Sequence, residues 1–250
     1  MIAGIFHQGS GLGNQLHRYV ATRVLALDKG YEWTMNYNAD GSGKQKGFKG
    51  NSFMDISWGQ NVQLMTERIW QEKKIVENGV DIRGYDPEFN FVEDNTIIDG
   101  EFQDERYFHR MKEIDEWLKV EPLDMPDNLC VIGFRGGEFA LFPDLFLTKE
   151  YWEEAKVLML QKNINMRFEV HTDDEILAQQ FFPDYTVIHD IDINWRSMRY
   201  AKYAIIANSS FYILPRLLNG GITIAPRFWA RRNTKVWCLP QNFYKSFQYI

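Results

Sequence analysis

The stretch LCVIGFRGGE, residues 129–138, joins six strand-like apolar residues to an arginine that two glycines follow. A continuous apolar run of this length, bounded by turn residues, is typical of a strand buried on both faces. Strands of that kind occupy the middle of parallel sheets, where helices cover each face. Residues 129–134 therefore predict a buried strand of a parallel sheet, with Arg135 at its carboxyl end.

The sequence after this stretch alternates between helix-like and strand-like segments. Strands that alternate with helices imply right-handed crossovers and a parallel sheet with helices on both faces. The expected helices cover 148–162 (capped by Thr148), 174–181, 195–202 and 212–218, and the expected strands cover 167–171, 185–189, 204–207 and 222–225.

The first half of the chain begins in the same way. Residues 2–6 predict a strand that leads into the glycine-rich stretch GSGLGNQL, residues 9–16. Further elements are expected as a helix over 62–77 and a strand over 96–99. Apolar residues after the glycines recur at helical spacing and would bury one helix face: Leu16, Val20, Val24 and Leu27.

A segment with two prolines, VEPLDMPDN at 120–128, is the best candidate for a linker. It divides the chain into residues 1–124 and 125–250, which we expect to be two α/β halves with Rossmann-like parallel sheets. Ligands of open parallel sheets bind outside the carboxyl ends of the strands. The sequence therefore predicts a ligand cleft that the two halves face.

Composition excludes several classes of protein. The 250 residues carry a formal net charge of −6, whereas a general nucleic-acid binder needs a dominant basic surface. The basic residues Arg227, Arg231, Arg232 and Lys235 could bind an anion or form a solvated patch. Neither a signal peptide nor a window of membrane-spanning length is evident, so a cytoplasmic protein without a transmembrane segment is expected.

Three loops that follow predicted strands have the residues of an anion site. Gly9–Leu16 suits a phosphate cradle, although a structural turn is the favoured interpretation because its spacing fits no nucleotide fingerprint. Arg135 suits bidentate phosphate binding, and the glycines beside it allow a ligand to approach. Residues 208–211 (NSSF) either cap a helix or bind phosphate. All three together indicate a function more strongly than any one.

Other chemistries find little support. Asp190 and Asp192 form an Asp-x-Asp pattern that holds a divalent cation in some sugar-nucleotide enzymes, but a capping carboxylate is the favoured interpretation. No histidine has ligand spacing to another, so neither a zinc site nor any other metal site is expected. A Gly-x-Ser-x-Gly elbow is absent, which disfavours a serine hydrolase.

Five blocks in order resemble the α-1,2-fucosyltransferases, which are inverting enzymes with a two-domain GT-B fold that use GDP-fucose. GSGLGNQL resembles the family's GGLGNQM, and GEFQDERYF at 100–108 resembles GYFQSEKYF. Residues 133–138 stand where HVRRGD is expected. The sequences IIANSSF at 205–211 and IAPRFW at 224–229 resemble IIANSSF and IAPxxW. These blocks span nearly the whole chain.

The resemblance implies that residues 1–124 form an acceptor-side domain and that residues 125–250 form a GDP-sugar-binding domain. It also implies roles for individual residues. Arg135 would pair with the β-phosphate of the donor, and Asp173, with Asp174 as second choice, would offer a carboxylate to the guanine. The remaining donor-binding residues implied by the resemblance are Gly11, Leu12, Gly13 and Asn14 on one side of the cleft and Ser209, Ser210 and Phe211 on the other.

The chain departs from the family at the HVRRGD motif. Gly133 replaces the histidine, Gly136 replaces the second arginine, and Glu138 replaces the aspartate. Loss of one preorganised hydrogen-bond donor lowers the rate roughly 10²–10³-fold. The departures therefore affect which sugar donor is used and whether the protein is catalytically active. Two alternatives stay open: a relative that uses another GDP-sugar, and a non-catalytic binder of a nucleotide sugar or glycan.

The expected reaction is a single displacement that needs no cofactor and no metal. An acceptor hydroxyl of a glycan would attack the anomeric carbon of the sugar while negative charge builds on the departing diphosphate. Arg135 and the N–H groups of the loops would balance that charge. Glu138 is the candidate base, and Arg135 and Glu138 are thus the predicted catalytic residues.

Overall fold

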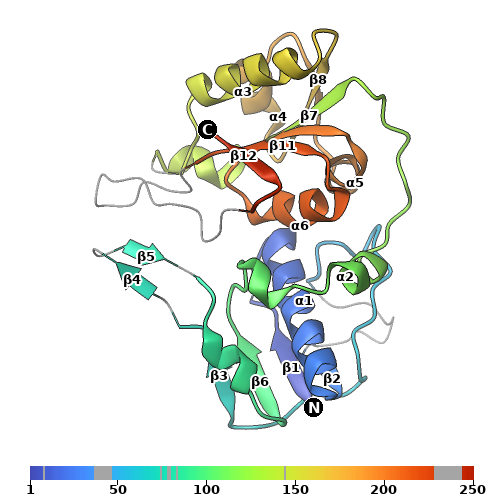
Figure 1. The fold of residues 1–250 in the computed structure, drawn as a ribbon, viewed down its shortest axis with the longest axis vertical. Coiled ribbons are helices and arrows are strands. Elements are labelled where there is room, and N and C mark those ends of the chain that lie inside the picture. Colours follow the sequence, from blue (N-terminus) through green and yellow to red (C-terminus); the bar gives the residue numbers. More distant parts are fainter. Residues whose placement is uncertain are drawn as a thin grey trace. The chain divides into compact units, whose positions relative to one another are not determined.

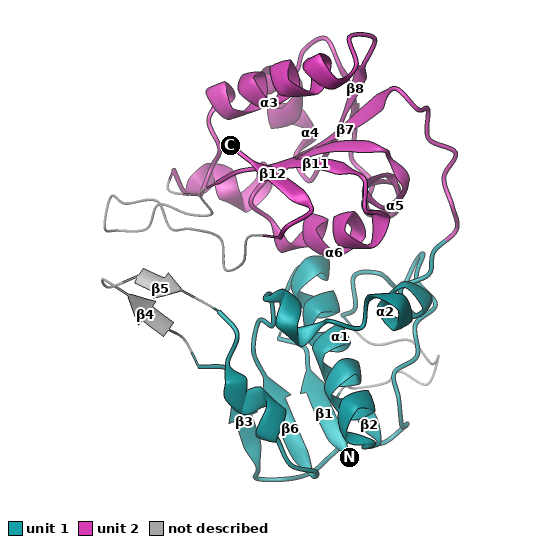
Figure 2. Cartoon of the chain, viewed as in Figure 1, with its two compact units in different colours: residues 1–77, 81–120 teal, residues 78–80, 121–250 magenta. Residues whose placement is uncertain are grey.

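The computed structural model describes residues 1–7, 9–36, 47–73, 75–77, 80–82, 84–143, 145–227 and 244–250. Contacts divide the chain into two compact units (Figure 2). Unit 1 comprises Met1–Glu77 and Asp81–Val120, and unit 2 comprises Asn78–Val80 and Glu121–Ile250. Each unit is built on its own parallel sheet, which confirms the predicted α/β fold class with two parallel-sheet halves.

Unit 1 is organised around a four-stranded parallel sheet in the order β2-β1-β6-β3 (Figure 1). The helix α1 packs against β1 and β2. It begins after Gly11 and ends at Gly30, which adopts the left-handed conformation that favours glycine (φ 68°). The elements are β1 (Ile2–Ile5), α1 (Leu12–Lys29), β2 (Trp33–Asn36), β3 (Ile69–Gln71), β4 (Ile75–Glu77), β5 (Val80–Ile82), β6 (Thr96–Asp99) and α2 (Met111–Trp117).

Unit 2 has a six-stranded parallel sheet in the order β12-β11-β10-β7-β8-β9. Its elements are β7 (Leu129–Phe134), α3 (Lys149–Lys162), β8 (Arg167–Thr172), α4 (Glu175–Phe181), β9 (Thr186–Ile188), α5 (Ile191–Tyr200), β10 (Tyr203–Ile206), α6 (Ser210–Asn219), β11 (Ile222–Ala225) and β12 (Phe247–Tyr249).

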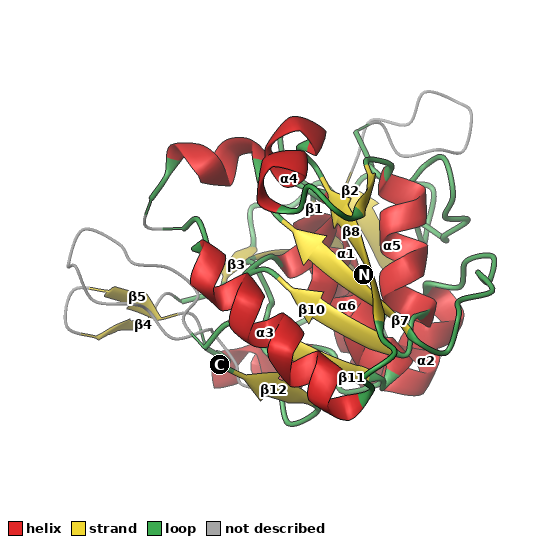
Figure 3. Ribbon diagram, turned by 90° about the horizontal axis from the view of Figure 1, so that it is seen from above, coloured by secondary structure: helices red, strands yellow, loops and turns green. Residues whose placement is uncertain are grey.

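Helices cover both faces of this second sheet (Figures 1 and 3). The ring of Phe134 in β7 contacts Trp152 of α3 and Phe181 of α4. The neighbouring residue, Gly133, faces α5 and α6 on the opposite side. Because successive strand residues point to opposite faces, β7 is buried on both, as its apolar sequence predicts.

One predicted element is wrong. The described residues within 62–77 form no helix: 69–71 and 75–77 are strands, and β3 pairs in parallel with β6. Side chains of β2 hold the segment before β3, since Thr34 Oγ1 donates to the carbonyl of Val62 at 2.9 Å and Asn36 bonds the backbone of Leu64. These nonlocal bonds and the sheet pairing override the local helical spacing.

The other predicted elements are present, with shifted bounds for some. The strands over 96–99, 129–134 and 222–225 have the predicted limits, whereas α5 begins four residues earlier than expected. Leu27 is 48% exposed and does not belong to the buried face of α1. No helix in the described part of the chain is long and apolar enough to cross a membrane.

A fully buried arginine ties three elements of unit 2 together. Arg216 in α6 donates to the carbonyls of Met198 and Ala201 at the end of α5, at 2.9 and 2.7 Å. Its Nε donates to Thr223 Oγ1 in β11 at 2.8 Å. Burial lowers the pKa of this guanidinium to about 10, so Arg216 stays charged at neutral pH. Its hydrogen bonds fix α6, the helix that follows the NSSF loop, to α5 and β11.

His17 of α1 makes the stability of unit 1 depend on pH. The ring is fully buried against Phe108, and Nδ1 shares a 2.8 Å hydrogen bond with the carbonyl of Gly13. Burial lowers the pKa of His17 from 6.5 to about 4. Between pH 6.5 and 4 the unfolded chain therefore binds a proton that the folded protein does not. The free energy of unfolding thus decreases as the pH is lowered from 6.5 to 4.

We expect the free energy of unfolding to lose about 3 kcal/mol from this group between pH 6.5 and 4. Urea unfolding of the wild type and of His17→Leu across this range measures the effect. The variant should show the shallower dependence on pH because it has no imidazole to protonate. Equal slopes for the two proteins would contradict this role of His17.

Candidate functional site

The predicted arginine lies at the carboxyl end of β7 and is bound by two carboxylates. Arg135 pairs through Nη1 with Asp173, and its Nη2 donates to Glu138 Oε1 at 3.1 Å. The backbone N–H of Gly136 also donates to Asp173, at 2.9 Å. Because β7 and β8 pair with Phe134 opposite Thr172, the residues after each strand meet at one edge of the sheet. The structure thus brings Arg135, Asp173 and Glu138 together.

Two glycines allow this close approach. A Cβ on Gly136 would lie 2.7 Å from the Cβ of Asp174, and a Cβ on Gly137 would lie 2.3 Å from Asp173 Oδ2. Gly137 also has a positive φ of 37°. The second arginine of HVRRGD therefore has no room at position 136 while Asp174 keeps its place. The glycines in this loop are a packing requirement of the neighbouring β8–α4 turn.

Asp174 has a structural role at the start of α4. Its carboxylate accepts the N–H of Leu177 at 3.0 Å and caps the helix. Asp190 does the same for α5 by accepting the N–H of Ile193 at 2.8 Å, and Asp192 pairs with Arg196 at 2.7 Å. The Asp-x-Asp pattern is therefore a helix cap followed by an ion pair. Asp173, in contrast, faces Arg135.

The NSSF loop follows β10, the strand on the other side of β7. Ser209 caps the ten-residue helix α6, and its Oγ accepts the N–H of Phe211 at 3.4 Å. Ser209 is buried, whereas Ser210 and Phe211 are partly exposed. The loops that carry Asp173, Arg135 and Ser209 thus follow three adjacent strands, in the order β8, β7 and β10.

Tyr212 connects the start of α6 to the end of β7, next to Arg135, and was not predicted. Its buried hydroxyl donates to the carbonyl of Phe134 at 3.3 Å. Burial raises the pKa of this phenol, the charge of Asp173 raises it further, and Arg135 lowers it. A Cβ on Gly133 would lie 2.7 Å from the Tyr212 ring. Tyr212 therefore fills the space into which a histidine at position 133 would project.

In unit 1, the glycine-rich stretch forms the start of α1. Gly11 precedes the helix with extended backbone, and Leu12 and Gly13 are buried. Asn14 Oδ1 accepts the side-chain N–H of Gln103 at 3.0 Å. This bond joins the two sequence blocks of unit 1 that resemble the fucosyltransferase motifs. The glycine loop thus leads into α1, and a role of Gly11, Leu12, Gly13 and Asn14 in donor binding stays a prediction.

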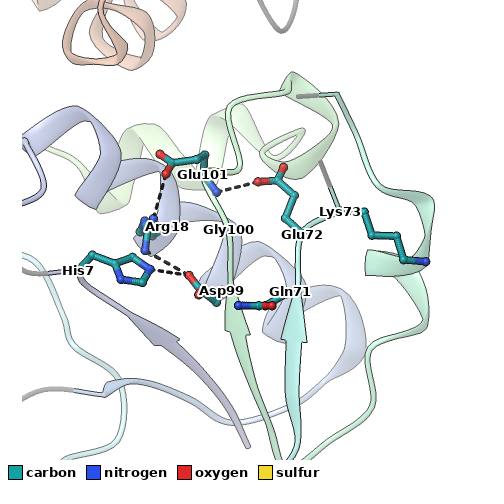
Figure 4. Close-up of a pocket in the computed structure, with 8 residues that line it drawn as sticks. All are labelled: His7, Arg18, Gln71, Glu72, Lys73, Asp99, Gly100 and Glu101. Carbon is teal, nitrogen blue, oxygen red and sulfur yellow. Dashed lines mark hydrogen bonds and ion pairs between the residues drawn. The ribbon is translucent and has the colours of Figure 1, made fainter. Parts of the chain in front are cut away.

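A pocket of about 340 Å³ opens in unit 1 and was missed from the sequence (Figure 4). It lies at the carboxyl ends of three adjacent strands, β1, β6 and β3, where open parallel sheets bind ligands. The sequence contains a pattern that could have predicted this pocket, because a polar residue ends or follows each of these strands. The lining residues are His7, Arg18, Gln71, Glu72, Lys73, Asp99, Gly100 and Glu101.

His7, Arg18, Asp99 and Glu101 of this pocket form one connected cluster, whereas Lys73 pairs with Glu88 outside it (Figure 4). Asp99 Oδ1 lies 2.7 Å from His7 Nε2 and 3.4 Å from Arg18 Nη1. Arg18 Nη2 donates to Glu101 Oε1 at 3.2 Å. Glu72 accepts the backbone N–H of Glu101 at 2.7 Å, which fixes the turn after β6.

Metal ligands do not gather in the part of the chain that the structure describes. Within those residues, no three or more His, Cys, Asp or Glu side chains form a group that could hold a metal ion. Phe228 and Trp229 of the IAPRFW block lie outside the described residues, as do Arg231, Arg232 and Lys235 of the basic cluster.

Neither a protein-family model nor a curated protein matches the chain. Among solved structures, it is similar to E. coli heptosyltransferase WaaC with ADP (10% identity, TM-score 0.44, covering 100% of this chain and 92% of that chain). It is also similar to NodZ alpha-1,6-fucosyltransferase soaked with GDP-fucose (13%, 0.49, 86% and 92%) and to fucosyltransferase NodZ from Bradyrhizobium (12%, 0.41, 86% and 93%).

Proposed function

We propose that the protein is a glycosyltransferase that moves fucose from GDP-fucose to a hydroxyl of a glycan acceptor, with inversion at the anomeric carbon. The observation that carries the proposal is Arg135, which lies among glycines at the carboxyl end of a central strand. The five sequence blocks that resemble α-1,2-fucosyltransferases support it, and they supply the choice of donor and linkage.

The loop of Arg135 has the donors that a diphosphate requires. A guanidinium presents paired N–H groups that match carboxylate and phosphate oxygens equally well. Asp173 and Glu138 already occupy these donors with anionic oxygens. Ser210 and the N-terminus of α6 would add hydroxyl and N–H donors, since α6 follows the strand next to β7.

In the proposed reaction, the acceptor oxygen attacks the anomeric carbon as the carbon–oxygen bond to the diphosphate breaks. The departing oxygen keeps the electron pair, and Arg135 balances the negative charge that develops. The phosphate oxygens would take over donors of Arg135 from Glu138, whose side chain is 68% exposed and free to move away. Asp173 holds the guanidinium in place from the other side.

A donor panel tests this function. The protein is incubated with GDP-fucose, other GDP-sugars, UDP-sugars and ADP-sugars, each with a galactose-ended acceptor, and released nucleotide and product are quantified. The proposal expects turnover with GDP-fucose and a product of opposite anomeric configuration by NMR. Turnover with another GDP-sugar alone would show that this sugar nucleotide, and not GDP-fucose, is the donor. GDP binding without any turnover would favour the non-catalytic binder.

A further inference from the structure

We propose that the two carboxylates bound to Arg135 have opposite effects on donor binding. Asp173 is a positioning residue that orients the guanidinium, whereas Glu138 is a competitor that the diphosphate must displace. This inference rests on the proposed function and deepens it. It gives Glu138 a role other than that of a base, and it predicts changes of opposite sign in the affinity for a diphosphate when the two carboxylates are neutralised.

Asp173 is bound through both of its carboxylate oxygens. Its Oδ2 pairs with Arg135 Nη1, and its Oδ1 accepts the backbone N–H of Gly136 at 2.9 Å. Gly137 also passes close by, because a Cβ at that position would collide with Asp173 Oδ2. Moving this carboxylate away from Arg135 would therefore break two hydrogen bonds and disturb the packing of the loop.

The residues on either side of Asp173 are fixed as well. The carbonyl of Thr172 accepts a hydrogen bond from Asn194 Nδ2 of α5 at 3.0 Å, and Thr172 Oγ1 accepts the N–H of Asp174 at 3.0 Å. Asp174 in turn caps α4. These bonds hold the backbone at Asp173, so its carboxylate is a preorganised partner for Arg135.

Glu138 makes a weaker contact with the same guanidinium. Its Oε1 accepts Arg135 Nη2 at 3.1 Å, the one hydrogen bond of this side chain among the described residues. The Glu138 side chain is 68% exposed, against 29% for Asp173, and it lies in the 3₁₀ turn Gly137–Leu141, in which no residue is buried. Exposed ion pairs contribute little, because solvent screens the charges and a long side chain loses freedom. Another anion can therefore replace Glu138 at little cost.

The position of Glu138 is the one that a phosphate oxygen would need. Asp173 holds Nη1 of Arg135, and the guanidinium lies over the ring of Phe139, with its central carbon 5.2 Å from the ring centroid. Nη2 is thus the group of Arg135 with the less firmly bound partner. Carboxylate and phosphate oxygens accept the same N–H groups, so Glu138 and the diphosphate compete for Nη2.

Titration calorimetry with pyrophosphate and with GDP tests both roles in Asp173→Asn and Glu138→Gln. Each substitution removes one negative charge beside Arg135, so a change in local charge alone would tighten the binding of an anion in both variants. We expect Asp173→Asn to bind pyrophosphate about tenfold more weakly, because the guanidinium loses the partner that orients it. We expect Glu138→Gln to bind it about threefold more tightly, because the competing anion is removed.

Glu154→Gln and Asp184→Asn are the matched controls. Both carboxylates are exposed in unit 2, in α3 and in the turn before β9, away from the loop of Arg135. Both variants should bind pyrophosphate as the wild type does. A partly unfolded variant lowers the number of binding sites in the titration and leaves the Kd of its folded fraction unchanged, so a loss of folding is distinguished from a loss of affinity.

The effect of Asp173 must also depend on Arg135. In an Arg135→Met background there is no guanidinium to orient, so Asp173→Asn should change the Kd for GDP less than twofold. An undiminished tenfold loss in that background would overturn the positioning role. A loss of affinity for GDP with no loss for pyrophosphate would assign Asp173 to the guanine and would overturn this role too.

Single-turnover transfer distinguishes a competitor from a base at Glu138. Loss of a general base lowers the rate of transfer roughly 10²–10⁴-fold. A loss of that size in Glu138→Gln, with an unchanged Kd for pyrophosphate, would identify Glu138 as the base and overturn the proposal.

The signs of the two shifts separate this proposal from the proposed function. If the shifts are opposite but the wild type transfers no sugar from any donor, the proposed function is wrong and the roles of the two carboxylates stand. If the wild type transfers fucose but both variants shift in the same direction, the roles are wrong and the function stands. A wild type that binds neither GDP nor pyrophosphate would overturn both.

Discussion

Replacing Arg135 with methionine is expected to slow sugar transfer by roughly 10²–10³. The side chain supplies a preorganised positive charge, and methionine keeps much of its length without the charge. Its two bonds to Asp173 and Glu138 also show that its guanidinium is oriented before any donor binds. The measurement is steady-state release of GDP from GDP-fucose in the presence of acceptor.

Arg167→Met is the matched control for this experiment. Arg167 is an exposed arginine of the same unit at the opposite, amino end of β8. The Arg167→Met variant should therefore retain wild-type turnover, because removing a positive charge far from the donor site does not weaken donor binding or slow transfer. An equal loss in both variants would mean that Arg135 acts only through the overall charge of the unit.

Restoring the family's histidine at position 133 is expected to destabilise unit 2 by about 4 kcal/mol or more. Gly133 lies in the buried centre of β7, where a Cβ alone would sit 2.7 Å from Tyr212 Cε1 and 2.8 Å from Met198 Cε. Neither neighbour can move far, because Tyr212 and Met198 belong to packed helices and are buried. Urea unfolding of Gly133→His measures the loss.

Two companion variants identify the cause of that loss. Gly11→His should cost little, because nothing lies within 4 Å of a Cβ at that glycine. Gly133→His combined with Tyr212→Ala should recover part of the stability, since the tyrosine ring is the obstacle. Wild-type stability for Gly133→His alone would show that the histidine is missing for a reason other than space.

The fold of each unit could largely be predicted because its strands are short apolar runs with clear flanking turns. Residues 96–99, 129–134 and 222–225 became strands with the predicted limits. Residues 62–77 could not be predicted, because Thr34 and Asn36 fix that region through bonds across about 28 positions of sequence. The edge strand 247–249 has only three residues and no distinct pattern.

The site could be predicted residue by residue but not as an arrangement. Arg135 and Asp173 were both expected near the donor, yet the ion pair between them depends on the parallel pairing of β7 and β8. Asp173 remains a candidate for the guanine contact that the resemblance implies. His7 and Asp99 escaped notice because they are far apart in sequence, and only the pairing of β1 with β6 brings them together.

Calorimetric titration of the protein with GDP tests the central claim, that the loop of Arg135 binds the diphosphate of the donor. The account predicts that the wild type binds GDP and that Arg135→Met binds it about 10²-fold more weakly, as loss of two charge-assisted hydrogen bonds implies. Equal affinity of the two proteins for GDP, with Arg167→Met also unchanged, would contradict it.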